Sequence, residues 1–276
     1  DDNDPPPNPM PDITFHGDRL WGISGDTVRF SLHPIDGTVV NGVAEECWPP
    51  LYTFRFNAPV KLMSSSSGLL IFTQECIHII TGKRRDEFDP DVLYYGIGIS
   101  NRHAVAKDGD TFYLFTNTKE IMKIGEQVEV ISHELSDSDL STFNPATVRL
   151  TVFRKGTRTS LYVSNGANKT FRYCLDTGTW SPVWTVDGGV VSTDVVAAVQ
   201  TAIGTWNLLY GPVHGNSGFI WKEDESTHLN DTVTYTCNLR LGSFILSPLG
   251  APLAGLTSIL TQANILPSVT ILPQEI

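Results

Sequence analysis

The chain has 276 residues, of which 41% are hydrophobic and 18% charged, and its formal charge is -11 from 19 basic and 30 acidic side chains. This length and composition suit one β-propeller or two ordinary globular domains. The acidic balance argues against binding to a nucleic-acid backbone, which requires clustered lysine and arginine. No apolar run approaches the roughly 20 residues of a membrane-spanning helix, so we expect neither a nucleic-acid partner nor a membrane span.

The chain opens with an acidic, proline-rich stretch, residues 1–12, which we expect to be a linker or an extended arm. The first predicted hairpin follows. Its two strands, Leu20–Ser24 and Thr27–Ser31, flank a turn at Gly25 and Asp26.

The next passage, Leu32–Asn57, is long for a bare connection and therefore predicts a functional or interface loop. Trp48 stands in this loop beside two prolines, which disfavour regular structure around it. We expect Trp48 to be the most exposed tryptophan of the chain. It is our candidate for an interface or ligand contact.

The clearest hairpin signal lies between Gly68 and Gly82. Leu69–Thr73 and Ile77–Thr81 are short apolar runs, partly β-branched, and polar Gln74 and Glu75 separate them. Runs of this length and composition favour strand over helix.

The same pattern recurs downstream. Further hairpins are predicted at Thr111–Thr116 with Glu120–Ile124, Ser160–Ser164 with Thr170–Cys174, and Asn207–Gly211 with Gly218–Trp221. If Trp21, Phe72, Tyr113, Tyr162 and Leu209 are equivalent points, the steps are 51, 41, 49 and 47 residues. Repeats of roughly 40–50 residues with several strands each are typical of β-propellers. We therefore predict an all-β fold, a propeller of five or six blades made of antiparallel sheets.

Three segments follow from this pattern. Residues 1–12 form the linker or arm, residues 13–231 the β-propeller, and residues 232–276 a closing blade or the start of a further β-domain. Both ends of the sequence look like cuts through a longer polypeptide. Within the propeller, Tyr94–Ser100 predicts a strand with a glycine bulge, and Glu134–Phe143 predicts a short helix capped by Ser136.

Two acidic clusters, Glu87 with Asp89 and Asp91, and Asp137 with Asp139, have the oxygen ligands that Ca²⁺ prefers. Neither has the glycine and bidentate glutamate of a known calcium loop, so solvated loop surfaces are the favoured interpretation. The four cysteines are scattered singly and give no zinc pattern. We expect no metal site and no cofactor.

The sequence also contains no recognised catalytic motif. There is no nucleophile elbow, P-loop, dinucleotide fingerprint or H-E-x-x-H motif, and the seven histidines lie far apart in the chain. A carboxylate pair of the glycosidase kind would suit a propeller, but nothing selects one. We predict no catalytic residues and no enzymatic activity.

The order of the segments resembles a β-propeller found in structural proteins of tailed bacteriophages, of the tail, neck and nozzle type. The motifs that carry the resemblance are His16–Ser31, Leu69–Gly82, Gly96–Arg102, Asp108–Leu114, Ile131-Ser132, Tyr173–Ser181 and Leu209–Trp221. Each motif is a generic strand-and-turn pattern, and their order is the more specific feature. The loop between His33 and Pro59 and the tail from Leu246 to Ile276 depart from the pattern, which leaves the number of blades open.

This resemblance implies a virion protein without enzymatic activity, a rigid propeller that contacts other virion subunits in a symmetric homo-oligomer. The alternative is a propeller of a tail appendage that binds or hydrolyses a host surface glycan during host attachment. Exposed tryptophans, Trp48 above all, would then stack on sugar rings.

Overall fold

The computed structural model of the chain describes residues 7–32, 39–40, 43–44, 48–165, 169–182, 193–202, 205–212 and 221–222. The chain divides into two compact units, residues 1–234 and 235–276, and all described residues belong to the first. The predicted segment 232–276 therefore lies outside the described residues. The α-helix that the structure describes has four residues, so no described helix is long enough to cross a membrane.

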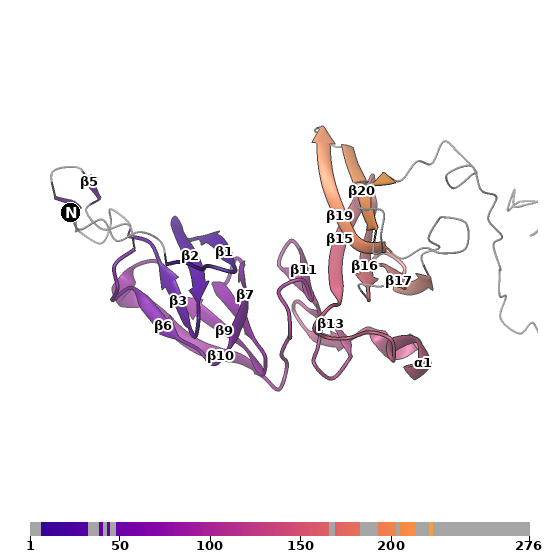
Figure 1. Ribbon diagram of the computed structural model, residues 1–276, viewed down its shortest axis with the longest axis horizontal. Coiled ribbons are helices and arrows are strands. Elements are labelled where there is room, and N and C mark those ends of the chain that lie inside the picture. Colours follow the sequence, from indigo (N-terminus) through magenta and orange to yellow (C-terminus); the bar gives the residue numbers. More distant parts are fainter. Residues whose placement is uncertain are drawn as a thin grey trace, which may run out of the picture. The chain divides into compact units, whose positions relative to one another are not determined.

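Within the described residues, four four-stranded antiparallel sheets follow one another along the chain (Figure 1). The first sheet contains β1 (Ile13–His16), β2 (Arg19–Ser24), β3 (Thr27–Phe30) and β6 (Thr53–Arg55). The second contains β7 (Pro59–Ser64), β8 (Leu69–Thr73), β9 (Cys76–Thr81) and β10 (Asp89–Tyr95). The third contains β11 (Val105–Asp108), β12 (Thr111–Phe115), β13 (Ile121–Ile124) and β14 (Val128–Val130). The fourth contains β15 (Arg149–Lys155), β16 (Arg158–Ser164), β17 (Thr170–Cys174) and β18 (Thr179–Pro182).

A fifth sheet, a short hairpin, two 3-10 turns and one short helix complete the described secondary structure. A three-stranded fifth sheet is formed by β19 (Thr193–Ala202), β20 (Thr205–Pro212) and β21 (Trp221–Lys222). A minimal hairpin, β4 (Val39–Val40) with β5 (Val43–Ala44), lies in the connection between β3 and β6. Short 3-10 turns occupy Arg85–Glu87 and Ser132–Glu134, and helix α1 spans Asp137–Leu140.

The five sheets correspond to the predicted repeats. Trp21, Phe72, Tyr113, Tyr162 and Leu209 lie on β2, β8, β12, β16 and β20, and each of these is the second strand of its sheet. Consecutive antiparallel sheets of four strands are the blades from which β-propellers are built. The predicted fold class is confirmed, with four complete blade-like sheets and a fifth of three strands among the described residues.

Strand β8 is buried on both of its faces. Leu69 and Ile71 belong to a core shared with Trp21 and Phe30 of the first sheet. Leu70 and Phe72 point the other way and belong to a core that continues through the third and fourth sheets. Successive side chains of a strand point to opposite faces, so this one apolar run joins two hydrophobic cores.

An aromatic stack connects the third and fourth sheets. Phe143 is 1% exposed, and its ring centroid lies 6.0 Å from that of Phe115 on β12 and 5.8 Å from that of Phe171 on β17. Phe143 reaches this position from the end of the segment that holds α1. Ser136 caps α1 as predicted, because its Oγ accepts a hydrogen bond from Asp139 N at 3.2 Å.

The end of the predicted arm is bound to the first two sheets. The Asp12 carboxylate is 8% exposed and lies 2.7 Å from Lys61 Nζ. Its second oxygen accepts a hydrogen bond from Leu62 N at 2.7 Å, and the Asp12 carbonyl oxygen accepts one from Ile23 N at 3.0 Å. The residue that ends the proline-rich stretch therefore links β2 to β7.

The predicted strand at Tyr94–Ser100 is wrong in its extent. Strand β10 ends at Tyr95, and its irregularity lies between Val92 and Tyr94 and involves no glycine. Beyond the strand, the chain leaves the sheet because Gly98 packs directly on the β8–β9 turn. A Cβ atom at Gly98 would lie 2.0 Å from the Gln74 carbonyl oxygen.

The close contact at Gly98 predicts a large effect of one methyl group. We expect Gly98→Ala to lower the free energy of unfolding by about 1–3 kcal/mol, because two backbone segments would have to separate. The measurement is chemical denaturation followed by tryptophan fluorescence. Gly125→Ala is the matched control, since its Cβ would meet only the Thr111 side chain, at 3.3 Å. An equal loss in both variants would contradict the close-packing explanation.

The contacts of Asp12 predict that the arm stabilises the sheets. We expect Asp12→Asn to lower the free energy of unfolding by about 1–3 kcal/mol, because a buried acceptor of charge-assisted hydrogen bonds is lost. Glu129→Gln tests an ordinary surface pair, since Glu129 and Lys123 are 53% and 42% exposed and 3.6 Å apart. That change should cost less than about 1 kcal/mol. If Asp12→Asn unfolds at the same denaturant concentration as the wild type, the arm is not a stabilising element.

Candidate functional site

Trp48 is not an exposed anchor, so the expectation of exposure was wrong. Its side chain is 5% exposed, whereas Leu51, three residues later, is 79% exposed. The prolines make a turn here, and Tyr52 N donates a hydrogen bond to the Pro49 carbonyl oxygen at 2.9 Å. Tyr52 in turn packs against Phe30, with 4.9 Å between the ring centroids. The loop thus folds back on the first sheet, and Trp48 is not available for stacking on a sugar.

The two acidic clusters are occupied by local hydrogen bonds. The Glu87 carboxylate accepts hydrogen bonds from Lys83 N and Arg84 N, both at 3.3 Å. Asp139 accepts one from Ser136 Oγ at 2.7 Å and lies 2.9 Å from Lys169 Nζ. Across the described part of the chain, no three histidine, cysteine or acidic side chains gather closely enough to hold a metal ion.

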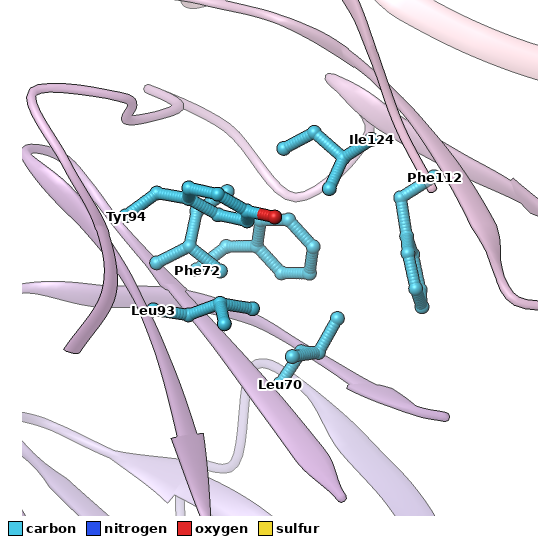
Figure 2. A pocket seen from close by; sticks show the side chains of 7 residues that line it. Leu70, Phe72, Leu93, Tyr94, Phe112 and Ile124 are labelled. Carbon is cyan, nitrogen blue, oxygen red and sulfur yellow. The ribbon is translucent and has the colours of Figure 1, made fainter. Parts of the chain in front are cut away.

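An apolar crevice lies between the second and third sheets (Figure 2). Figure 2 shows Leu70, Phe72, Leu93 and Tyr94 on one side and Phe112 and Ile124 on the other. Its volume is about 10 Å³, close to that of a single water molecule. The lining side chains offer no convergent polar groups. The crevice is therefore an edge of the hydrophobic core rather than a ligand pocket.

The first strands of the sheets concentrate positive charge. By first strands we mean β1, β7, β11, β15 and β19, each of which is an edge strand of its sheet. They lie beside one another: β1 contacts β7, β11 contacts β15, and β15 contacts β19. Their sequences contain five basic and two acidic residues, whereas the whole chain contains 19 and 30. Positive charge in this acidic protein is thus gathered where the sheets meet.

One polar group on these strands joins three sheets. His16 Nδ1 lies 2.8 Å from Ser64 Oγ, and Lys107 Nζ donates a hydrogen bond to the Ser64 carbonyl oxygen. Lys107 also lies 5.7 Å from the centre of the Phe112 ring. Residues of β1, β7 and β11 are thereby connected.

This Ser–His pair has the distance required for proton transfer, but its surroundings oppose nucleophilic catalysis. Burial, and then the Lys107 ammonium group, lower the pKa of His16. A histidine that acts as a general base becomes positively charged when it takes up the proton. Burial and the Lys107 charge both disfavour that charge on His16. Within the described residues, no carboxylate bonds to the other ring nitrogen to offset them. We therefore interpret the pair as a contact between sheets.

The second polar group, which we call the basic cluster, consists of Lys61, Arg102, His103 and Arg149. The loop before β11 holds two of its members, and Arg102 Nε lies 3.3 Å from His103 Nε2. The Arg102 guanidinium also donates to the Pro11 carbonyl oxygen, next to the carboxylate that pairs with Lys61. The His103 carbonyl oxygen accepts from Leu150 N at 2.8 Å, which places Arg149 beside this loop.

The other three members of the basic cluster affect the pKa of His103. Burial lowers the pKa of His103 most, and the positive charges of Arg149, Arg102 and Lys61 lower it further. The Asp12 carboxylate acts in the opposite direction and more weakly. Four side chains from three segments of the chain are thus held near one another by the contacts of Asp12, Pro11 and the His103 carbonyl oxygen.

The residues of the basic cluster were not singled out by the sequence, although a signal exists. Lys61, Arg102 and Arg149 are separated by 41 and 47 residues. The first equals the step of 41 residues from Phe72 to Tyr113, and the second is two residues shorter than the step of 49 from Tyr113 to Tyr162. Basic residues spaced at about the repeat length would therefore have pointed to this cluster.

No family model and no curated protein matches the chain. Solved structures with a distant likeness include BBS1N in complex with ARL6DN, with TM-score 0.45, 10% identity and coverage of 76% of this chain and 62% of that chain. The N-terminal domain of Nup159 gives TM-score 0.42, 9% identity and coverage of 75% and 56%. A chain of an S. cerevisiae Dbp5 complex with Nup159, Gle1, IP6 and ADP gives 0.41, 7%, 75% and 53%. The chain thus spans less than two thirds of each, and we take nothing about function from them.

The lowered histidine pKa values predict that the protein loses stability in mild acid. Burial is the first cause for His16, His78 and His103, whose pKa values all lie below the usual 6.5. As the pH falls below 6.5, the unfolded chain binds protons that the folded chain resists. Stability is therefore full above pH 6.5 and declines as the pH falls toward the folded-state values.

Thermal unfolding between pH 7.5 and pH 5 measures this decline. We expect the melting temperature of His16→Gln to fall less over this range than that of the wild type. The variant lacks one of the histidines whose protonation the folded state disfavours. His133 is exposed and serves as the control, so His133→Gln should keep the wild-type slope. A wild-type melting temperature that is constant or rises on acidification contradicts the prediction.

Proposed function

We propose that the chain is a structural component of a bacteriophage virion, in the tail, neck or nozzle, without enzymatic activity. Its sheets would form a rigid body that contacts neighbouring subunits in a symmetric homo-oligomer. The phage assignment is supported by the order of motifs from His16–Ser31 to Leu209–Trp221. The role in subunit contact is supported by an apolar strip on the first sheet.

The apolar strip consists of Ile13, Phe15 and Leu20, which are 52%, 61% and 44% exposed. Phe15 on β1 pairs directly with Leu20 on β2, and Ile13 lies two residues along the same strand. Their side chains therefore share one face of the first sheet. Trp21 and Ile23 point to the opposite face and are each 1% exposed, packed towards the second sheet.

An exposed group of large apolar side chains on a sheet face is typical of a protein–protein interface. Arg29 pairs in register with Gly22, so its side chain lies on the same face as the strip. Arg55 follows on the same face, because it pairs with Thr27 two residues before Arg29. An apolar centre flanked by arginines is the composition that protein interfaces favour. The other members of this virion assembly, including further copies of the chain, would cover the strip.

The glycan-binding alternative depended on stacking of a sugar ring on Trp48. It relied on an exposed Trp48, and that side chain is 5% exposed. Among the side chains that the structure describes, the exposed large aromatic ones are Phe15 and Tyr95, and they lie on different sheets, on β1 and β10. The structural role is therefore the proposal that the geometry supports better.

The proposal is tested by the oligomeric state of the purified protein, measured by light scattering coupled to size-exclusion chromatography and by negative-stain imaging. We expect a ring-shaped homo-oligomer. The double change Phe15→Ser with Leu20→Ser removes side chains whose burial contributes about 1.5–3 kcal/mol each, so the assembly should weaken at least about tenfold.

Leu51→Ser is the matched control, because Leu51 is 79% exposed and lies outside the apolar strip. It should leave the assembly unchanged. A wild-type protein that stays monomeric at all concentrations, or a double variant that assembles normally, would falsify the proposed contact. Cleavage of a bacterial surface polysaccharide by the purified protein would contradict the non-enzymatic role.

A further inference from the structure

The basic cluster holds more positive than negative charge among the groups that act on His103. Lys61, Arg102 and Arg149 supply three positive charges, and Asp12 supplies one negative charge, which leaves a net charge of +2. His103 adds none at pH 7, because its pKa is lowered. This excess lies within a chain whose formal charge is -11. Like charges brought together by folding repel one another unless an anion lies between them.

The single carboxylate of the group already has a partner for each of its two oxygens. One Asp12 oxygen lies 2.7 Å from Lys61 Nζ, and the other accepts a hydrogen bond from Leu62 N at 2.7 Å. Arg102 is directed at the Pro11 carbonyl oxygen and at the His103 ring.

Arg149 is the member of the cluster with an unpaired buried donor atom. Its Nε atom is buried and has no hydrogen-bond partner within the described part of the chain. Buried donors are almost always paired, and a charged one without a partner is especially costly. The residue begins β15, so the strand holds its backbone in place beside the loop that contains His103.

We infer that the basic cluster binds an oxyanion, a phosphate or carboxylate group, with Arg149 as the principal donor and Lys61 and Arg102 supplying further positive charge. A guanidinium group suits this role because its N–H groups form a planar fork that can donate to two oxygens at once. The inference rests on the cluster alone. It goes beyond the proposed virion role and stands or falls independently of it.

Wild-type protein and three simple anions provide the first test. The histidine ring resonances are followed by NMR during titration with pyrophosphate, inorganic phosphate or succinate, at constant ionic strength with chloride as the reference. A bound anion near His103 favours the charged imidazolium, so saturation should raise the pKa of His103. Tighter binding of the phosphates than of succinate assigns the site to phosphate groups, and the reverse order assigns it to carboxylates.

Two arginine variants provide the second test. Arg149→Gln removes the charge and the fork, and we expect the affinity for the better anion to fall roughly 10- to 100-fold. Arg158→Gln is the matched control, because Arg158 is exposed at the opposite end of the same β15–β16 hairpin. It should bind as the wild type does. Arg149→Lys keeps the charge without the fork and should bind with intermediate affinity.

Two results would overturn the inference that the basic cluster binds an oxyanion. Anion effects on His103 that do not saturate, or that chloride reproduces at equal ionic strength, overturn the inference. So does an Arg149→Gln variant that folds and retains wild-type affinity. If Arg149→Gln does not fold, the titration of the wild-type histidine still decides the question.

Discussion

Burial of single strands on both faces is the constraint on which this structure depends. In β8, Leu69 and Ile71 fill one core and Leu70 and Phe72 fill the next. Burying one such side chain stabilises the fold by about 1.5–3 kcal/mol relative to exposure, so each sheet gains stability from two neighbours at once. The last four residues of β12 and of β16 are also buried on both faces. An isolated sheet of this kind would expose an apolar face, and the sheets are therefore stable only as a stack.

The first sheet departs from this arrangement, and its departure gives the surface to which we assign subunit contact. Trp21 and Ile23 are buried on one face of β2, but Leu20 on the other face is 44% exposed. The same stacking that buries the apolar faces brings the first strands side by side. Lysines and arginines from separate repeats then become neighbours, because they lie on the first strands or in the loop that leads into one of them. The hydrophobic core, the apolar strip and the basic cluster thus all follow from the way in which successive sheets pack against one another.

Much of the local structure was predictable from the sequence. The predicted strands Leu69–Thr73 and Thr170–Cys174 have the bounds of β8 and β17, and the Ser136 cap of α1 is present. The errors share a cause. Trp48 and the stretch after Tyr95 were judged by their neighbours in the chain. The first is buried in the tertiary structure, and the second leaves its sheet where Gly98 packs on the distant β8–β9 turn.

By itself, the sequence determined the positions of the strands and turns, the all-β class and the repeat of roughly 40–50 residues, because these depend on alternation and turn chemistry over a few residues. Only the tertiary structure decided that Asp12 binds Lys61 across 49 positions, that Trp48 is enclosed, and that Arg149 lies beside Arg102 and His103. Contacts of that kind arise when whole sheets stack. They depend on which faces meet, and a one-dimensional pattern does not specify that.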